Sequence, residues 1–196
     1  MAYTDFDIKR IENQFQLVLI EDQDLFSHVQ EVYVSDFFET LLKTNVPLAQ
    51  AIGTEKAKSE LITINVMLEL KRQRNIGLFS GIEFSVDKAE GLNGFCDFLI
   101  SKFPEQLFVK APVIAIVEAK NENIIAGLGQ CAAEMIAARI FNARENQPYE
   151  TIYGAVTTGH SWKFLKLEAN HLMIDLEDYY IKNPRKIVAI LSAMVN

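Results

Sequence analysis

The stretch 113–120 constrains the fold most, because five apolar residues are followed by Glu118, Ala119 and Lys120. A strand that is apolar on both faces belongs in the interior of a sheet that is covered on both sides. Side chains alternate along a strand, so Glu118 and Lys120 point to one face and Ala119 to the other. Removing a carboxylate and an ammonium from water is costly unless they pair or bind a cation. This charged strand end therefore predicts a functional site.

A second carboxylate, Asp97, lies in the preceding strand-like run, 94–100. Two carboxylates and a backbone carbonyl suit Mg²⁺ or Mn²⁺, since such ions prefer oxygen ligands and retain several waters. Lys120 can orient the attacking water, or take its proton if the pKa of the lysine is lowered. The residue types thus predict metal-dependent hydrolysis of a phosphodiester, with Asp97, Glu118 and the Ala119 carbonyl as metal ligands.

The rest of the chain predicts helices and strands in a mixed order. Residues 15–20 either finish the first helix or form a short strand, and Pro47 is expected near the end of the second helix. The order predicts an α/β or α+β fold, a central mixed sheet flanked by helices, in a single domain 1–196. Helices are expected over 4–14, 33–50, 54–74, 123–142 and 185–194, and strands over 79–86, 94–101, 113–119, 149–157, 161–167 and 171–176.

Composition narrows the class of protein. The chain has no basic and apolar leader at its start and no apolar run of the ~20 residues that a membrane-spanning helix needs, so we expect no membrane contact. Two cysteines, Cys96 and Cys131, are too few for a disulfide scaffold, which predicts buried, reduced thiols and a cytoplasmic protein. A net charge of −7 argues against a nonspecific nucleic-acid coat protein, but not against an enzyme with a local basic groove.

The order of these elements resembles a known superfamily. A strand with Asp97, a strand ending in Glu118-Ala119-Lys120 and a helix rich in small residues resemble the PD-(D/E)XK, or restriction-endonuclease-like, nucleases over about 54–160. Glu118 follows Asp97 by 21 residues, a spacing the superfamily tolerates. The resemblance implies a restriction-endonuclease-like core with an N-terminal helical extension, and a nuclease that uses Mg²⁺ or Mn²⁺ on DNA more than on RNA.

The resemblance also adds two residues to the site. Glu60 resembles the acidic residue that this superfamily often places on its first core helix, which makes it a further metal ligand. Gln130 resembles the glutamine of members related to exonucleases and helicase-associated nucleases, which makes it a catalytic residue. Glu134 stands where those members often carry an aromatic residue, and Cys96 replaces the proline of the eponymous motif.

Several alternatives remain open from the sequence. Glu118 and Lys120 can form a simple strand-end ion pair while Asp97 caps a turn. The protein can be a catalytically inactive binding or interaction module of the same fold, or a homo-oligomer, such as a homodimer, joined through its apolar helices. Other candidates are further acidic ligands, which are more simply explained as exposed carboxylates, and basic residues for a nucleic-acid groove: Glu69, Glu83 and Glu122, and Arg139, Arg144, Lys163 and Lys166.

Overall fold

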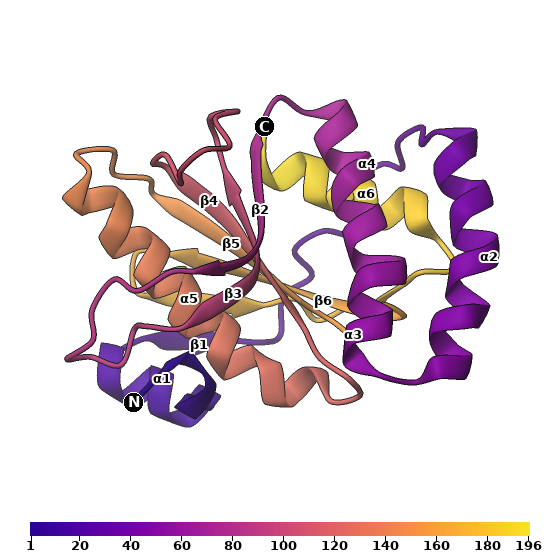
Figure 1. Cartoon of the computed structure of the whole chain (residues 1–196). Helices are drawn as coiled ribbons and strands as arrows, with labels where there is room; N and C mark the ends of the chain where they lie inside the picture. Colours follow the sequence, from indigo (N-terminus) through magenta and orange to yellow (C-terminus); the bar gives the residue numbers. More distant parts are fainter.

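An eight-stranded mixed sheet forms the centre of the computed structural model, which describes residues 1–196 (Figure 1). The strands are β1 (Val18–Ile20), β2 (Gly77–Glu83), β3 (Phe95–Ser101), β4 (Val113–Ala119), β5 (Thr151–Thr157), β6 (Ser161–Glu168), β7 (His171–Ile174) and β8 (Tyr179–Tyr180). The helices are η1 (Tyr3–Asp5), α1 (Ile8–Phe15), α2 (Asp36–Ile52), α3 (Glu55–Lys58), η2 (Ser59–Thr63), α4 (Ile64–Gln73), α5 (Ile124–Arg144) and α6 (Pro184–Met194).

The strand order is β1-β7-β6-β5-β4-β3-β2, with β8 also beside β6. Strand β4 lies between β3, which is antiparallel to it, and β5, which is parallel to it. All seven β4 residues are buried, as its apolar sequence predicts. The predicted mixed sheet flanked by helices is therefore confirmed, and the parallel strands β4 and β5 bring their carboxyl ends to the same end of the sheet.

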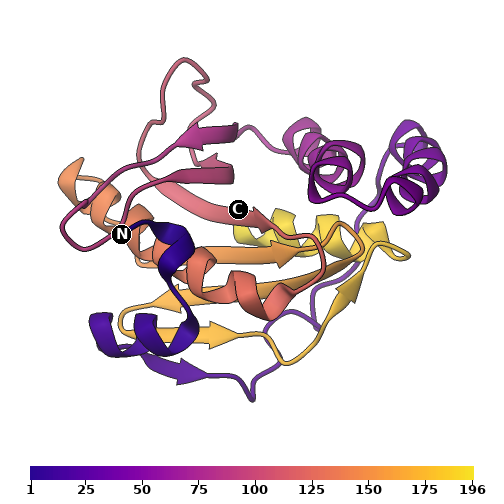
Figure 2. The ribbon, with the colours of Figure 1, turned by 60° about the horizontal axis from the view of Figure 1, so that its bottom comes forward.

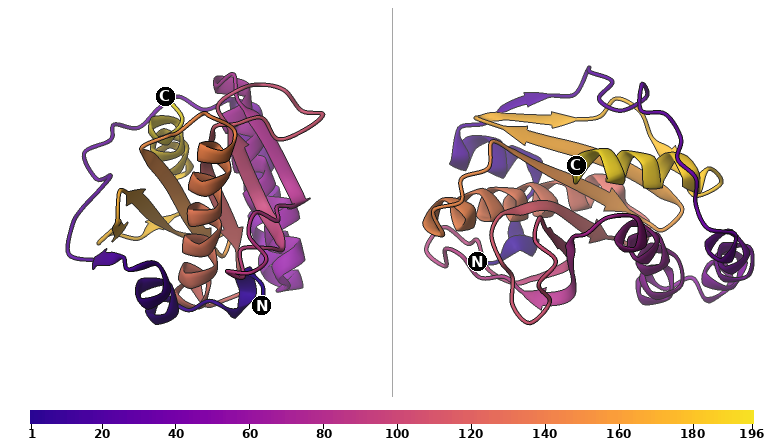
Figure 3. Two further views of the ribbon diagram at one scale, coloured as in Figure 1. Left: turned by 90° about the vertical axis from the view of Figure 1, so that its left-hand side faces the viewer. Right: turned by 90° about the horizontal axis from the view of Figure 1, so that it is seen from above.

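Helices cover both faces of the sheet, and each face has its own apolar core (Figures 2 and 3). Helix α5 packs on one face together with η1 and α1, while α2, α4 and α6 pack on the other. The N-terminal segment approaches α5 very closely at Gly129, where a Cβ atom would lie only 2.4 Å from the Phe6 carbonyl oxygen. Helix α5 is thus enclosed between the sheet and the N-terminal segment.

Helix α5 is the one helix of the protein that is long and apolar enough to span a membrane. By length and composition alone, α5 could cross a membrane, but 67% of its most apolar window is buried inside the protein. The core helix of a globular fold has the same composition, because it is covered on several sides. The apolar character of α5 is explained by its packing against the sheet.

Two helix predictions need correction, and one open alternative is resolved. Helix α2 continues for five residues past Pro47 and ends at Gly53, whose φ of 75° closes the helix in the left-handed conformation. The predicted helix 54–74 is interrupted by the π-helical segment η2. Residues 18–20 form β1, a strand that pairs in parallel with β7, and the short strand β8 was not predicted.

Candidate active site

Asp97 and Glu118 face each other across neighbouring strands. The antiparallel register ends with the pair of Phe98 and Val117, and Asp97 and Glu118 are the next residues on the two strands, near enough for the Asp97 charge to add to the effect of burial on the pKa of Glu118. Residues directly opposite each other have Cβ atoms about 4.5–5.5 Å apart and share a face of the sheet. The Ala119 amide donates a hydrogen bond of 2.8 Å to Asp97 Oδ2. The two predicted carboxylates are therefore brought together, and Asp97 accepts a bond from the next strand and does not cap a turn.

Lys120 lies on the same side as Glu118, as strand alternation predicts. Its Nζ donates hydrogen bonds of 2.7 Å to Glu118 Oε1 and 2.8 Å to Gln130 Oε1. Space for the lysine stem comes from Gly127, where a Cβ atom would lie 2.9 Å from Lys120 Cγ and 2.7 Å from Val156. The small residues at the start of α5 thus admit a lysine between the helix and the sheet.

Gln130 connects Lys120 to a further buried acid that sequence reasoning did not assign to the site. Gln130 Nε2 donates a hydrogen bond of 3.0 Å to Glu134 Oε1, one helical turn further along α5. Gln130 is 6% exposed and Glu134 is fully buried. The only signal for Glu134 in the sequence was its i+4 spacing from Gln130. The outcome is a continuous chain of hydrogen bonds from Glu118 through Lys120 and Gln130 to Glu134.

Two carboxyl oxygens in this chain have no hydrogen-bond partner. They are Glu118 Oε2 and Glu134 Oε2, both of which are buried. Burial raises the pKa of Glu118 to about 8, and the neighbouring Asp97 adds to the rise while Lys120 opposes it. Burial also raises the pKa of Glu134 well above its ordinary value, with Glu118 as the next cause. The site therefore holds more buried carboxyl groups than its single lysine, Lys120, can neutralise.

The lysine stays charged in this surrounding. Burial alone would lower the pKa of Lys120, but the charge and hydrogen bond of Glu118, with smaller contributions from Glu55 and Asp97, raise it above its ordinary value. A lysine with a raised pKa is a poor proton acceptor near neutral pH. Of the two roles predicted for Lys120, the raised pKa favours orienting the water over taking its proton.

Glu60 does not lie with the other site residues. Its side chain is 66% exposed and forms only a surface ion pair of 3.8 Å with Lys56. Instead, Glu55 at the start of α3 is near enough to Lys120 for its charge to raise the pKa of the lysine. Of the two acids, Glu55 in the first turn of α3 is therefore the one whose charge reaches Lys120.

Glu69 and the four basic candidates have partners of their own, whereas Glu83 and Glu122 are exposed carboxylates, as expected. Glu69 is 2% exposed, so the expectation of an exposed carboxylate is wrong for it. The four basic residues suggested for a groove each contact a carboxylate or a carbonyl within the chain: Arg139 with Ala169, Arg144 with Asp87, Lys163 with Asp178 and Lys166 with Glu168. Both cysteines are free and buried, as predicted.

The side-chain oxygens at the site limit the kind of metal ion that it can hold. No group of three or more His, Cys, Asp or Glu side chains is arranged to hold one. Two carboxylates are available, Asp97 and Glu118, and the unpartnered Glu118 Oε2 is an oxygen that a cation could satisfy. Such a set fits an ion that keeps several waters, as Mg²⁺ does, and does not fit a closed site made only of protein ligands.

Comparison with known proteins adds no relative to this description. The chain matches no protein-family model, no curated protein and no solved structure.

Proposed function

We propose that this protein is a metal-dependent nuclease with a restriction-endonuclease-like core, acting on DNA. The observation that carries the proposal is the facing pair Asp97 and Glu118 with Lys120 bonded beside it. A buried carboxyl pair is expensive to keep, and groups with strongly perturbed pKa values gather at sites that bind cations or transfer protons.

The chain's own residues suit phosphodiester hydrolysis. Asp97 and Glu118 would hold Mg²⁺ or Mn²⁺, which lowers the pKa of a bound water and neutralises charge on a phosphate. Lys120, which stays protonated, would orient the water and stabilise negative charge on the phosphate. Gln130 fixes the position of the lysine through its 2.8 Å hydrogen bond. The carbonyl of Ala119 remains a predicted third ligand.

A catalytically silent binding protein of the same fold is the second candidate. It is favoured by the absence of a third acidic ligand and by the direct ion pair of Glu118 with Lys120, which is the simple strand-end pair that the sequence left open. In such a protein Glu118 would only pair with Lys120, which fastens the end of β4 to α5 through its hydrogen bond to Gln130. The two candidates differ in whether a divalent metal ion makes the protein cleave DNA.

The test is cleavage of supercoiled plasmid and of single-stranded DNA with Mg²⁺ or Mn²⁺. Asp97→Asn, Glu118→Gln and Lys120→Ala are each expected to lose activity about 100-fold or more, as removal of a group that stabilises a transition state does. The matched control is Lys88→Ala, since Lys88 is exposed and its side chain makes no hydrogen bond or ion pair. Cleavage that all three site variants retain would reject the proposal, as would folded wild-type protein that cleaves neither substrate.

A further inference from the structure

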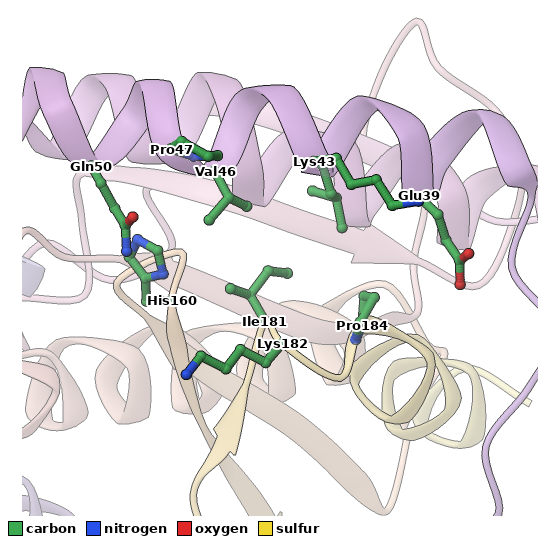
Figure 4. A pocket seen from close by; sticks show the side chains of 10 residues that line it. Glu39, Lys43, Val46, Pro47, Gln50, His160, Ile181, Lys182 and Pro184 are labelled. Carbon is green, nitrogen blue, oxygen red and sulfur yellow. The ribbon is translucent and has the colours of Figure 1, made fainter.

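A groove opens between α2 and the segment that joins β8 to α6 (Figure 4). It consists of two adjoining hollows of about 510 and 590 Å³, which share His160, Ile181 and Lys182 as lining residues. Hollows of this size are typical of sites that hold one small molecule or a short segment of a polymer. We call this feature the α2–β8 groove. Apart from His160 in the β5–β6 turn, its lining residues lie outside 54–160, the stretch that resembles the nuclease superfamily.

The unpaired charges in the α2–β8 groove are positive. Its two carboxylates are already occupied, because Glu39 forms an ion pair of 2.8 Å with Arg185 and Asp178 one of 2.9 Å with Lys163. The lining residues Lys43 and Lys182 form no ion pair and no side-chain hydrogen bond. In a protein of net charge −7, this leaves a local cationic groove. Its complement is an anion.

The groove also offers surfaces for a planar, uncharged group. Tyr180 lines the second hollow and is 57% exposed, although large aromatic side chains are usually covered. Val46 and Pro47 on α2 lie across the first hollow from Ile181, which makes part of both walls apolar (Figure 4). His160 Nε2 is buried there without a hydrogen-bond partner. Cations beside an exposed aromatic ring are the means by which proteins bind unpaired nucleotides, with phosphates on the cations and bases stacked on the ring.

The groove and the candidate active site lie at the same end of the sheet, where β4 and β5 end. The turn with His160 follows β5, whose last residue, Thr157, accepts a hydrogen bond of 2.7 Å from the Lys120 amide. Lys58 lies between the two places. Its Nζ donates to the Asn121 carbonyl at 2.7 Å, and its charge contributes, after burial, to the lowered pKa of His160. A strand bound in the groove would therefore run toward Lys120 past a further cation.

We propose that the α2–β8 groove binds an unpaired nucleic-acid strand, with Lys43 and Lys182 on its phosphates and Tyr180 against a base. This inference rests on the proposed nuclease function, since it names the path by which a single strand enters the site. It predicts that single-stranded DNA is bound better than duplex, because a base can stack on Tyr180 only when it is unpaired.

The test measures binding without cleavage. Fluorescein-labelled oligothymidylate of about ten nucleotides, which is within the usual site size, is titrated with full-length protein in EDTA and followed by anisotropy. The double variant Lys43→Ala/Lys182→Ala should weaken binding about tenfold and reduce the slope of log K against log salt by about 1.4, or 0.7 for each lost phosphate contact. Tyr180→Ala should weaken binding about tenfold through lost stacking, with the salt slope unchanged.

The matched control is Lys9→Ala/Lys88→Ala, which removes the same charge from exposed positions remote from the groove. The inference is overturned if both double variants weaken binding equally, if neither does, if duplex binds better than single strand, or if wild type binds no oligonucleotide. The readout is independent of catalysis. Binding that depends on the groove, without any metal-dependent cleavage, would support the groove and reject the nuclease. Cleavage together with binding that does not depend on the groove would support the nuclease and reject the groove.

Discussion

Two glutamates on opposite faces of the sheet are equally buried but differently satisfied. Glu69 and Glu118 are each 2% exposed. Glu69 accepts hydrogen bonds from the Ser35 amide and hydroxyl at 2.8 and 2.9 Å and contacts Arg72 and Gln73. Burial tends to raise the pKa of Glu69, but these hydrogen bonds outweigh it and lower the pKa. Glu118 keeps one oxygen unpartnered, and its pKa is raised.

The difference separates a structural acid from a candidate functional one. Glu69 stabilises the fold, because it fastens Ser35, the N-cap of α2, to α4. Glu118 is held where burial and, after it, the charge of Asp97 make its ionised form unfavourable and raise its pKa. A buried polar atom without a partner calls for an explanation, and a ligand is one of the few available. Burial alone would not have told these two residues apart.

The largest change in stability is expected at Glu69. Replacing it by alanine would leave the Ser35 amide and hydroxyl without their acceptor inside the protein and would loosen the start of α2. We expect Glu69→Ala to lower the free energy of unfolding by about 3 kcal/mol, as measured by urea denaturation. Glu69→Gln, which keeps one acceptor, should cost less. A loss as small as that of an exposed substitution would contradict the structural role assigned to Glu69.

A change at Gly127 should act on both the core and the site. The Cβ atom of an alanine would meet Val156 Cγ1 at 2.7 Å and Lys120 Cγ at 2.9 Å. We expect Gly127→Ala to destabilise the protein by about 1–3 kcal/mol, as overpacking does, and to displace Lys120 from Glu118. Urea denaturation measures the first effect and the cleavage rate of the folded fraction measures the second. Ala126→Gly, one position earlier, is the control for glycine effects in this turn.

The pH dependence of stability should distinguish Glu118 from Glu69. Between its ordinary pKa of 4.5 and its raised pKa of about 8, Glu118 holds a proton in the folded state that the unfolded state has released. The free energy of unfolding therefore contains a contribution from Glu118 that falls as pH rises through this window. Glu118→Gln should remove that fall, so that the melting temperature of the variant exceeds that of wild type at pH 8.

The opposite sign is expected of Glu69, whose pKa is lowered, because its contribution is present above its ordinary pKa and is lost in acid. Thermal melts of wild type, Glu118→Gln and Glu69→Gln between pH 4 and pH 8 make the comparison. Parallel pH profiles for wild type and Glu118→Gln would show that the raised pKa of Glu118 is not expressed in stability.

The smallest effect is expected at Glu60. Its ion pair with Lys56 spans 3.8 Å between side chains that are 66% and 82% exposed. Exposed pairs of this kind contribute about 0–1 kcal/mol, so Glu60→Gln should change stability by less than about 0.5 kcal/mol. It should also leave metal-dependent cleavage unchanged, while Glu55→Gln should lower it. Loss of cleavage in Glu60→Gln would restore Glu60 to the site.

The sequence predicted those parts of the site that depend on one strand or one helix turn. Alternation placed Glu118 and Lys120 on one face, and the apolar run placed β4 in the interior of the sheet. Gln130 was assigned through the resemblance, and its bond to Lys120 agrees with that assignment. What remained hidden depends on how elements dock. The choice of Glu55 over Glu60 depends on how α3 packs against the β5–β6 turn, where a Cβ on Gly159 would lie 3.4 Å from Lys58.

The same limit explains the error at Glu69. Its partner, Ser35, is 34 residues away in the sequence, and no periodicity within α4 indicates that a serine on a different helix will meet it. Glu134 illustrates the converse case. Its helical spacing from Gln130 was visible, but whether it faced the sheet or solvent was decided by the position of α5 between the sheet and the N-terminal segment.

The close approach of residues 6 and 7 to Gly129 also determines how the site can move. Gln130 and Glu134 belong to a helix that is held from both sides, so neither side chain can be withdrawn by the swing of a surface loop. Backbone amides in the middle of α5 should exchange with solvent only when much of the fold opens, whereas those near Glu60 should exchange through local fluctuations. Lys120, which is bonded to Gln130 on this helix, would thus be held rigidly. Any motion that admits a substrate would have to come from elements other than α5.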